Sequence, residues 1–195
     1  MRSKKPATKI ATASLLSLSL LGLGVPSFMG SADAASGPSV TSSQKNTKAI
    51  TTLNQLYNQA FSGEMPKLVH GLKVDTSTID DVHHQIGLPE EPAQPDDPFE
   101  KYHGSMGQAS YAFAYGATGR IAEIRYFGTQ IERQQNLGGI TPAVLSQQIG
   151  SADHILSVPE TNETDYVYQT GNYELHFVVG EDQTVDHVNL KAIAK

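Results

Sequence analysis

The chain has 195 residues, with 14 Lys and Arg, 20 Asp and Glu, and no cysteine. This length fits one ordinary domain, and 38% hydrophobic with 17% charged residues is typical of a globular rather than a disordered protein. The absence of cysteine excludes a disulfide framework, a thiolate metal site and a cysteine nucleophile.

The first 34 residues have the pattern of a secretory signal peptide. Four basic residues precede an apolar run from Ala13 to Val25, which is shorter than the ~20 residues needed to span a membrane. The small residues at 32 and 34 predict cleavage between Ala34 and Ala35. We expect a secreted or cell-wall-associated protein of a Gram-positive bacterium, with the periplasm as the alternative, because export without disulfides fits both.

Cleavage would make the chain more acidic. It would remove four of the 14 basic and one of the 20 acidic residues, which leaves 10 against 19 and a formal charge of −9. Binding to nucleic acid or anionic lipid needs clustered Lys and Arg, so we expect no nucleic-acid partner. We also expect no stable membrane span after cleavage, and the sequence leaves the oligomeric state open.

The expected domain follows a flexible leader. Residues 35–45 are small and polar, which predicts this leader, and a single domain is expected over residues 46–195. Residues 46–61 have helical periodicity, and Ser62-Gly63 followed by Pro66 ends the helix. The apolar stripe of this predicted helix consists of Ile50, Leu53, Leu56, Tyr57, Ala60 and Phe61.

Two later segments, residues 78–87 and 141–150, match each other at fixed offsets. Each has Thr at its start, an aliphatic residue four positions on, then Gln, Ile and Gly at positions seven, eight and nine. A Thr suits the N-cap of a helix, and a Gly suits the residue with positive φ that ends one. Both segments are therefore predicted to be short helices.

Each predicted helix is followed by predicted strands. Residues 110–115 and 120–127 form one expected hairpin, and residues 173–179 and 185–190 form another, with residues 166–168 leading into it. The pattern predicts an α+β fold of two tandem repeats, about 46–128 and 129–195. Each repeat would have short helices followed by an antiparallel β-meander, with the helices on one face of the sheet.

The pattern Thr78, Val82, Gly87 and Pro89 followed by strands resembles the helix-plus-sheet repeat of beta-lactamase inhibitory protein. The same signature is similar to that of the outer-membrane assembly lipoproteins of the BamE/SmpA type. The tandem arrangement is more similar to the inhibitory protein. This resemblance implies a sheet that grips another protein, without implying beta-lactamase as the target.

The mature chain as a whole resembles the YjgB-like family of exported Gram-positive proteins, a domain of unknown function. The segment Leu-Tyr-Asn-Gln-Ala at 56–60, with Gly63 and Pro66, carries this resemblance, which covers roughly residues 47–193. The family supplies no catalytic residues. The second repeat departs from the pattern, because Ser-Ala rather than x-Pro follows Gly150.

The segment 89–100 contains four prolines and five carboxylates. A solvated acidic loop is the main interpretation, with a recognition loop or a weak calcium site as alternatives. Gly104-Ser-Met-Gly107 is not a nucleophile elbow, and no phosphate loop is present. We therefore assign no catalytic residues and expect no cofactor.

The histidines are the candidates for a metal. Those at 83 and 84 are adjacent on a predicted helix and point about 100° apart, so they are poorly placed to share an ion. His176 and His187 lie on neighbouring predicted strands, with Asp186 or Glu174 close in sequence. They are weak metal candidates, because zinc sites usually take three protein ligands.

Aromatic residues concentrate on the predicted strands, and most of them must fill the core. A sheet covered by helices on one face leaves the other face free, and tyrosines suit recognition there. The candidate binding residues are Tyr111, Tyr115, Tyr126, Tyr168 and Tyr173. We expect a non-enzymatic exported binding module for a protein or an envelope polymer, with inhibition as one form of this function. The alternatives are a hydrolase of envelope polymers and a metal-responsive protein.

Overall fold

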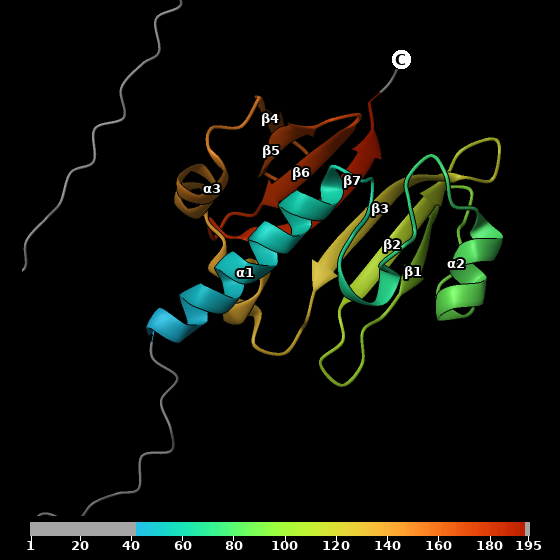
Figure 1. Cartoon of the computed structure of the whole chain (residues 1–195), viewed down its shortest axis with the longest axis horizontal. Helices are drawn as coiled ribbons and strands as arrows, with labels where there is room; N and C mark the ends of the chain where they lie inside the picture. Colours follow the sequence, from blue (N-terminus) through green and yellow to red (C-terminus); the bar gives the residue numbers. More distant parts are fainter. Residues whose placement is uncertain (1–41, 194–195) are drawn as a thin grey trace, which may run out of the picture. The chain divides into compact units, whose positions relative to one another are not determined.

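The computed structural model describes residues 42–193, with side chains from Thr47 onward. The predicted signal peptide, its cleavage site and residues 35–41 of the predicted leader lie outside the described residues. The described part contains three α-helices and seven strands (Figure 1). In chain order they are α1 (Ser42–Ala60), α2 (Ile79–Ile86), β1 (Phe99–Tyr102), β2 (Ser110–Tyr115), β3 (Ile121–Gly128), α3 (Pro142–Ile149), β4 (His154–Val158), β5 (Glu163–Thr170), β6 (Tyr173–Val179) and β7 (Val185–Ala192).

Three 3-10 helices complete the described elements: η1 (Lys67–Val69), η2 (Arg133–Gln135) and η3 (Leu137–Gly139).

Helix α1 lies across the sheet and packs against β6, α3, η2 and η3 (Figure 1). Its fully buried residues are Ala49, Leu53, Leu56 and Ala60, which share one face at helical spacing. Two expectations are corrected: the helix begins at Ser42 rather than 46, and Phe61 lies beyond its end and is 50% exposed.

Both short helices are confirmed with their predicted caps. The Thr78 hydroxyl accepts the Asp81 amide at 3.3 Å, and the Asp81 carboxylate accepts the Thr78 amide at 2.7 Å, which completes a capping box. The Thr141 hydroxyl accepts the Val144 amide at the same distance of 3.3 Å. The helices end at Gly87 and Gly150, with φ of 89° and 87°.

The seven strands form one antiparallel sheet in the order β1-β2-β3-β7-β6-β5-β4. Both predicted hairpins are confirmed as β2–β3 and β6–β7. Pairing of β3 with β7, for example Tyr126 with Val188, joins the two halves of the chain into one sheet. The α+β class is therefore correct.

Strands β1 and β4 were not expected from the sequence. β1 takes the last two residues of the predicted acidic loop, and Phe99 and Glu100 are 9% and 6% exposed, so the solvated-loop interpretation is wrong for them. β4 lacks a buried face, because its first four residues are exposed, and such a strand carries no alternating pattern.

Corresponding hydrogen bonds occur in the two halves. The Tyr102 hydroxyl donates to the Gly87 carbonyl at 3.4 Å, and the Tyr168 hydroxyl donates to the Gly150 carbonyl at 3.2 Å. In addition, the Ile121 amide donates to the Ser77 carbonyl, and the Val185 amide donates to the Ile140 carbonyl, both at 2.9 Å. Each short helix is thus attached to its own strands through the same kinds of atoms.

Candidate functional site

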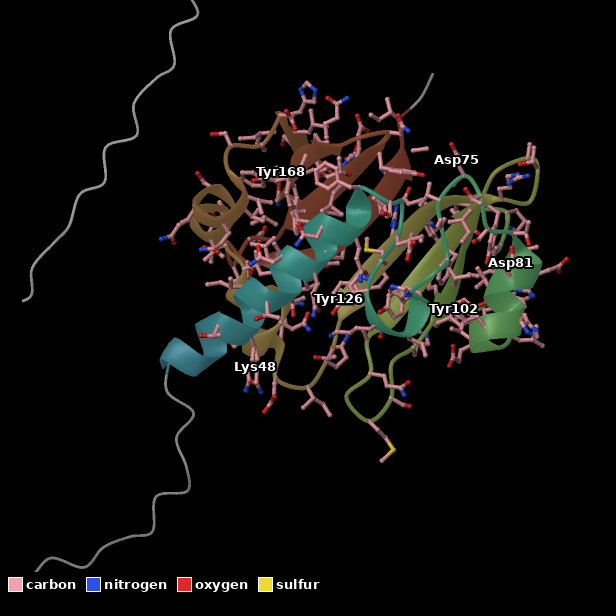
Figure 2. All side chains as sticks on the ribbon, viewed as in Figure 1. Lys48, Asp75, Asp81, Tyr102, Tyr126 and Tyr168 are labelled. Atoms are coloured by element: carbon pink, nitrogen blue, oxygen red, sulfur yellow. The ribbon has the colours of Figure 1, made fainter. Side chains whose placement is uncertain are left out.

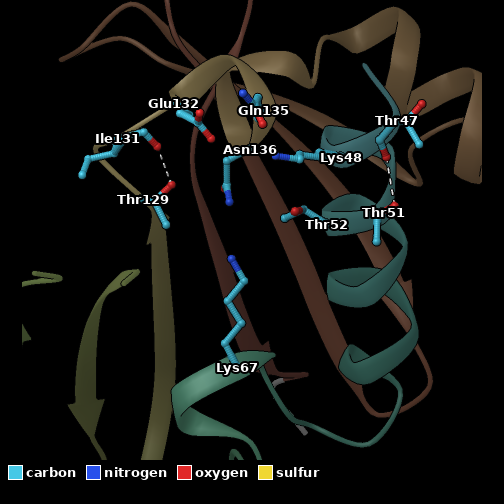
Figure 3. A pocket seen from close by; sticks show the side chains of 10 residues that line it. All are labelled: Thr47, Lys48, Thr51, Thr52, Lys67, Thr129, Ile131, Glu132, Gln135 and Asn136. Carbon is cyan, nitrogen blue, oxygen red and sulfur yellow. Dashed lines mark hydrogen bonds between the residues drawn. The ribbon is translucent and has the colours of Figure 1, made fainter. Parts of the chain in front are cut away.

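A pocket of about 320 Å³ opens between α1, η1 and the segment that follows β3 (Figure 3). This volume lies at the small end of the range for ligand sites, which runs from ~300 to ~1,000 Å³. Its lining residues are mostly polar, and nine of the ten carry a hydroxyl, an amide or a charge. They are Thr47, Lys48, Thr51, Thr52, Lys67, Thr129, Ile131, Glu132, Gln135 and Asn136.

Two lysines enter the pocket from different elements. Lys48 extends from the N-terminal half of α1, and Lys67 extends from η1, with both amines directed toward Asn136 (Figure 3). The Lys67 amine donates to the Tyr126 hydroxyl at 3.1 Å and lies 5.6 Å from the centre of that ring. This contact fixes one positive charge at the wall of the pocket.

Two buried amides form part of the same wall. Asn136 is 6% exposed; its Nδ2 donates to the Tyr126 hydroxyl at 3.3 Å, and its Oδ1 accepts the Leu137 amide at 2.9 Å. Gln135 is 9% exposed, and its Oε1 is buried without a hydrogen-bond partner among the described residues. Buried amide oxygens normally accept a hydrogen bond, so this enclosed oxygen is an exception, whereas the Asn136 amide is held in place at the wall.

The backbone around the pocket is strained at two lining residues. Lys67 has φ of 70° and Glu132 has φ of 56°, both in the left-handed region that favours glycine. Such conformations cost of order 1–3 kcal/mol each and cluster at functional sites. Lys67 and Glu132 are two of the six described non-glycine residues with positive φ, and both line this pocket.

Chemically, the pocket is suited to an anion that also carries hydroxyl groups. Two ammonium groups and one carboxylate, Glu132, leave the lining residues with a positive formal charge. Threonine hydroxyls and the amides of Gln135 and Asn136 offer neutral donors and acceptors around these charges. Lysine ammonium groups bind phosphate and carboxylate as point charges.

The five predicted binding tyrosines do not form one surface. Tyr111, Tyr126 and Tyr168 are at most 3% exposed and belong to the hydrophobic core, so the prediction that they form an open face is corrected. Strand alternation indicates which residues share a face, but it does not show that these three rings pack in one buried cluster with Leu53 and Leu56 of α1. Figure 2 labels Tyr126 and Tyr168, which lie on different strands of the sheet.

Tyr115 and Tyr173 are half-buried and separate from each other. The Tyr115 hydroxyl donates to Glu100 at 2.9 Å, whereas the Tyr173 ring packs against Gly63 at the end of α1. Of the five predicted tyrosines, Tyr126 is connected to the pocket, through its hydroxyl. The lysines and amides of the pocket were missed, because neither their spacing nor their composition forms a motif.

A second polar cluster surrounds the buried carboxylate of Glu100. It interacts with His83 Nε2 at 3.0 Å, and it accepts hydrogen bonds from Tyr115 at 2.9 Å and Tyr102 at 3.4 Å. Burial, together with the Glu100 charge, raises the pKa of both tyrosines well above the usual range. Both phenols therefore stay protonated as donors, and the cluster has the character of a satisfied structural network.

Of the two predicted metal-binding histidines, His176 and His187, the fold places only His187 in a cluster of possible metal ligands. His176 Nδ1 lies 2.8 Å from Asp165, and His187 Nδ1 lies 3.0 Å from Asp186. One group of donor atoms, from Glu163, Asp186 and His187, lies within 4.8 Å of one another, and His176 is not part of it. The hydrogen bond from His187 lowers the pKa of Asp186, which keeps that carboxylate ionised. These three residues can hold a divalent cation.

No helix among the described residues is long and apolar enough to cross a membrane.

The fold and the pocket together define a small α+β protein with a cationic, hydroxyl-lined cavity beside a seven-stranded sheet. The chain belongs to the family described as "Domain of unknown function (DUF4309)", which matches residues 53–191. The predicted relationship to the YjgB-like family is thereby confirmed.

Two comparisons support this membership. The chain is 49% identical to the uncharacterized protein YjgB of Bacillus subtilis (strain 168) over 189 residues, which cover 97% of this chain and 99% of that protein. It also matches the crystal structure of a DUF4309 family protein (YjgB) from the same bacterium, with a TM-score of 0.74 and 54% identity. That match covers 75% of this chain and 99% of the crystallised one.

Proposed function

We propose that the protein is an exported, non-enzymatic binding module whose pocket takes a small anionic ligand that carries hydroxyl groups. The observation that carries this proposal is the convergence of the Lys48 and Lys67 amines on a cavity walled by threonines and buried amides. The export part depends on the N-terminal signal pattern, and the place of action would be the envelope or the outside of the cell. We include an inhibitory role in this proposal, because the sequence pattern resembles that of beta-lactamase inhibitory protein.

The proposed architecture is a tandem repeat with the helices on one face of the sheet. The paired contacts of Tyr102 with Gly87 and of Tyr168 with Gly150 support it. In this architecture the pocket lies where the first residues of the second repeat, 129–136, meet α1 and η1 of the first repeat, so each repeat alone would lack it.

The test is direct titration of the purified protein with three probes: inorganic phosphate, glycerol 3-phosphate and glycerol. We expect glycerol 3-phosphate to bind more tightly than phosphate, because it adds hydroxyl contacts, and glycerol to bind too weakly to detect. The variants Lys48→Gln and Lys67→Gln should each weaken binding about tenfold, as expected for loss of one charge-assisted contact.

The matched control is Lys73→Gln, since Lys73 forms an ion pair with Glu64 and does not line the pocket. Equal loss of binding in Lys73→Gln would assign the effect to net charge and would overturn the pocket assignment. Failure of every probe to bind would overturn the proposed ligand class.

Metal response is a second candidate function, favoured by the three donor atoms of Glu163, Asp186 and His187. Zinc bound only to the folded state at 100 times its Kd would add ~2.7 kcal/mol to the free energy of unfolding. The resulting rise in Tm should disappear in Glu163→Gln and His187→Ala, and it should persist in the control His154→Ala, which removes an exposed strand histidine. An equal rise in all three variants would exclude this site.

A further inference from the structure

The two outer strands of the sheet are protected very differently. At the β1 edge, the proline-rich segment before the strand folds back and covers it. The Lys101 amide donates to the Glu91 carbonyl at 2.9 Å, the Glu91 amide donates back at 3.3 Å, and the Lys101 amine pairs with Asp97 at 2.9 Å. Proline and charge are common means of closing a sheet edge against further strands.

The β4 edge has no comparable protection among the described residues. β4 pairs with β5 on one side and with no strand on the other. Its large side chains Ile155 and Leu156 are 61% and 51% exposed. The strand, His-Ile-Leu-Ser-Val, contains no proline, lysine or carboxylate. An apolar edge of this kind accepts another strand through main-chain hydrogen bonds.

The charge around β4 indicates which strand it accepts. Residues 134–190 contain eight Asp and Glu and no Lys or Arg. Two of these carboxylates, Asp165 and Glu163, are paired in register with Leu156 and Val158 of β4. Asp153 and Glu160 flank the strand in sequence. A second copy of this chain would bring the same acidic set against itself, whereas a basic strand would be attracted.

We propose that β4 is a docking edge for an extended, cationic segment of a partner protein, in which apolar and basic residues alternate. Main-chain hydrogen bonds to the outer edge of β4 would extend the sheet. On the face that carries Leu156, basic side chains of the added strand would approach Glu163, since the Asp165 carboxylate is already paired with His176 at 2.8 Å. This surface is separate from the pocket, so the inference does not depend on the proposed small ligand.

The experiment uses the purified protein and a short synthetic peptide of alternating Val and Lys as the probe. We expect saturable binding that weakens as salt is raised. A peptide with Glu in place of Lys should not bind. A Val/Lys peptide with alternate amides N-methylated keeps all its charges but loses the backbone N–H groups along one edge, which would donate hydrogen bonds to β4. It should bind at least about tenfold more weakly.

The key variant is Leu156→Lys, which places a like charge on the exposed edge. Leu88→Lys is its matched control, because Leu88 is 77% exposed and follows α2, which lies at the opposite end of the sheet from β4 (Figure 1). We expect Leu156→Lys to lose about tenfold in peptide affinity and Leu88→Lys to change less than twofold, with unchanged circular dichroism and Tm in both. Since both positions are exposed, neither variant should fail to fold.

Three results would overturn the proposal. Equal losses of peptide affinity in the two lysine variants would mean that the peptide binds by nonspecific electrostatic attraction to the acidic protein. Unchanged binding of the N-methylated peptide would mean that no strand is added. Light scattering could also detect a dimer of the free protein. If Leu156→Lys abolished that dimer, the β4 edge would be occupied by a second copy of the chain.

Discussion

The amine of Lys67 donates a hydrogen bond at 3.1 Å to the hydroxyl of Tyr126, a residue whose ring is fully buried. The contact links η1, which carries a strained backbone at Lys67, to the centre of the sheet. The same hydroxyl receives a hydrogen bond from Asn136. One core tyrosine thus holds two of the pocket's polar residues in place.

Tyr126→Phe should keep the ring in the core and remove the hydroxyl. We expect a loss of about 1–3 kcal/mol in the free energy of unfolding, because Asn136 is left with an unpaired buried donor. Affinity for glycerol 3-phosphate should fall severalfold, because Lys67 loses its positioning partner. Urea unfolding and calorimetric titration measure the two effects. Unchanged affinity would separate Tyr126 from the site.

Tyr102→Phe and Tyr168→Phe should each destabilise the protein, and Tyr102→Phe should do so more strongly. Tyr168→Phe removes a hydrogen bond to the Gly150 carbonyl, with an expected loss of about 0.5–1.5 kcal/mol. The Tyr102 hydroxyl lies 3.4 Å from both the Gly87 carbonyl and the buried Glu100 carboxylate, so its removal should cost about 1.5–3 kcal/mol. Because the two sites share no partners, the double variant should show the sum of the two losses. Tyr166→Phe is the control, since its hydroxyl has no hydrogen bond among the described residues. A clearly non-additive double variant would contradict the independent attachment of the two helices.

Gly63→Ala should destabilise the protein more than Gly71→Ala. Both glycines have positive φ, 73° and 92°, so each substitution strains the backbone by about 1–2 kcal/mol. A Cβ on Gly63 would also lie 2.5 Å from the Tyr173 ring, whereas Gly71 has no atom within 4 Å of that position. The added clash should cost a further ~1–3 kcal/mol by chemical unfolding. Equal losses would show that the Tyr173 ring moves away freely.

Asp81→Asn should reduce stability at neutral pH but not in strong acid. Hydrogen bonds from the amide and hydroxyl of Thr78 lower the pKa of Asp81 below its usual 3.8. A lowered pKa in the folded state gives stability that is present above the unfolded value and lost as the pH falls through the folded value. The Tm difference between the variant and the original chain should therefore shrink between pH 7 and about pH 2. A constant difference would assign the effect to geometry rather than to charge.

The sequence by itself determined the local elements and the family relationship. The caps of α2 and α3 could be predicted because Thr, Pro and Gly act on the backbone within one helical turn. The hairpins β2–β3 and β6–β7 could be predicted because alternation and turn glycines are also local signals. The YjgB-like resemblance came from the same packing and turn residues, and it gave the family without an activity.

The tertiary structure alone decided the candidate site and the exposed edge. The pocket joins Lys48, Lys67 and Asn136 from three separate segments, and no local pattern encodes such a meeting. Alternation placed Tyr111 and Tyr126 on one face, but only the tertiary packing, which brings them into one core cluster with Leu53, decided that their rings are buried. β4 could not be predicted from the sequence for a related reason. A hydrophobic period arises in a strand because one of its faces is buried, and β4 is an edge strand that is exposed on both faces.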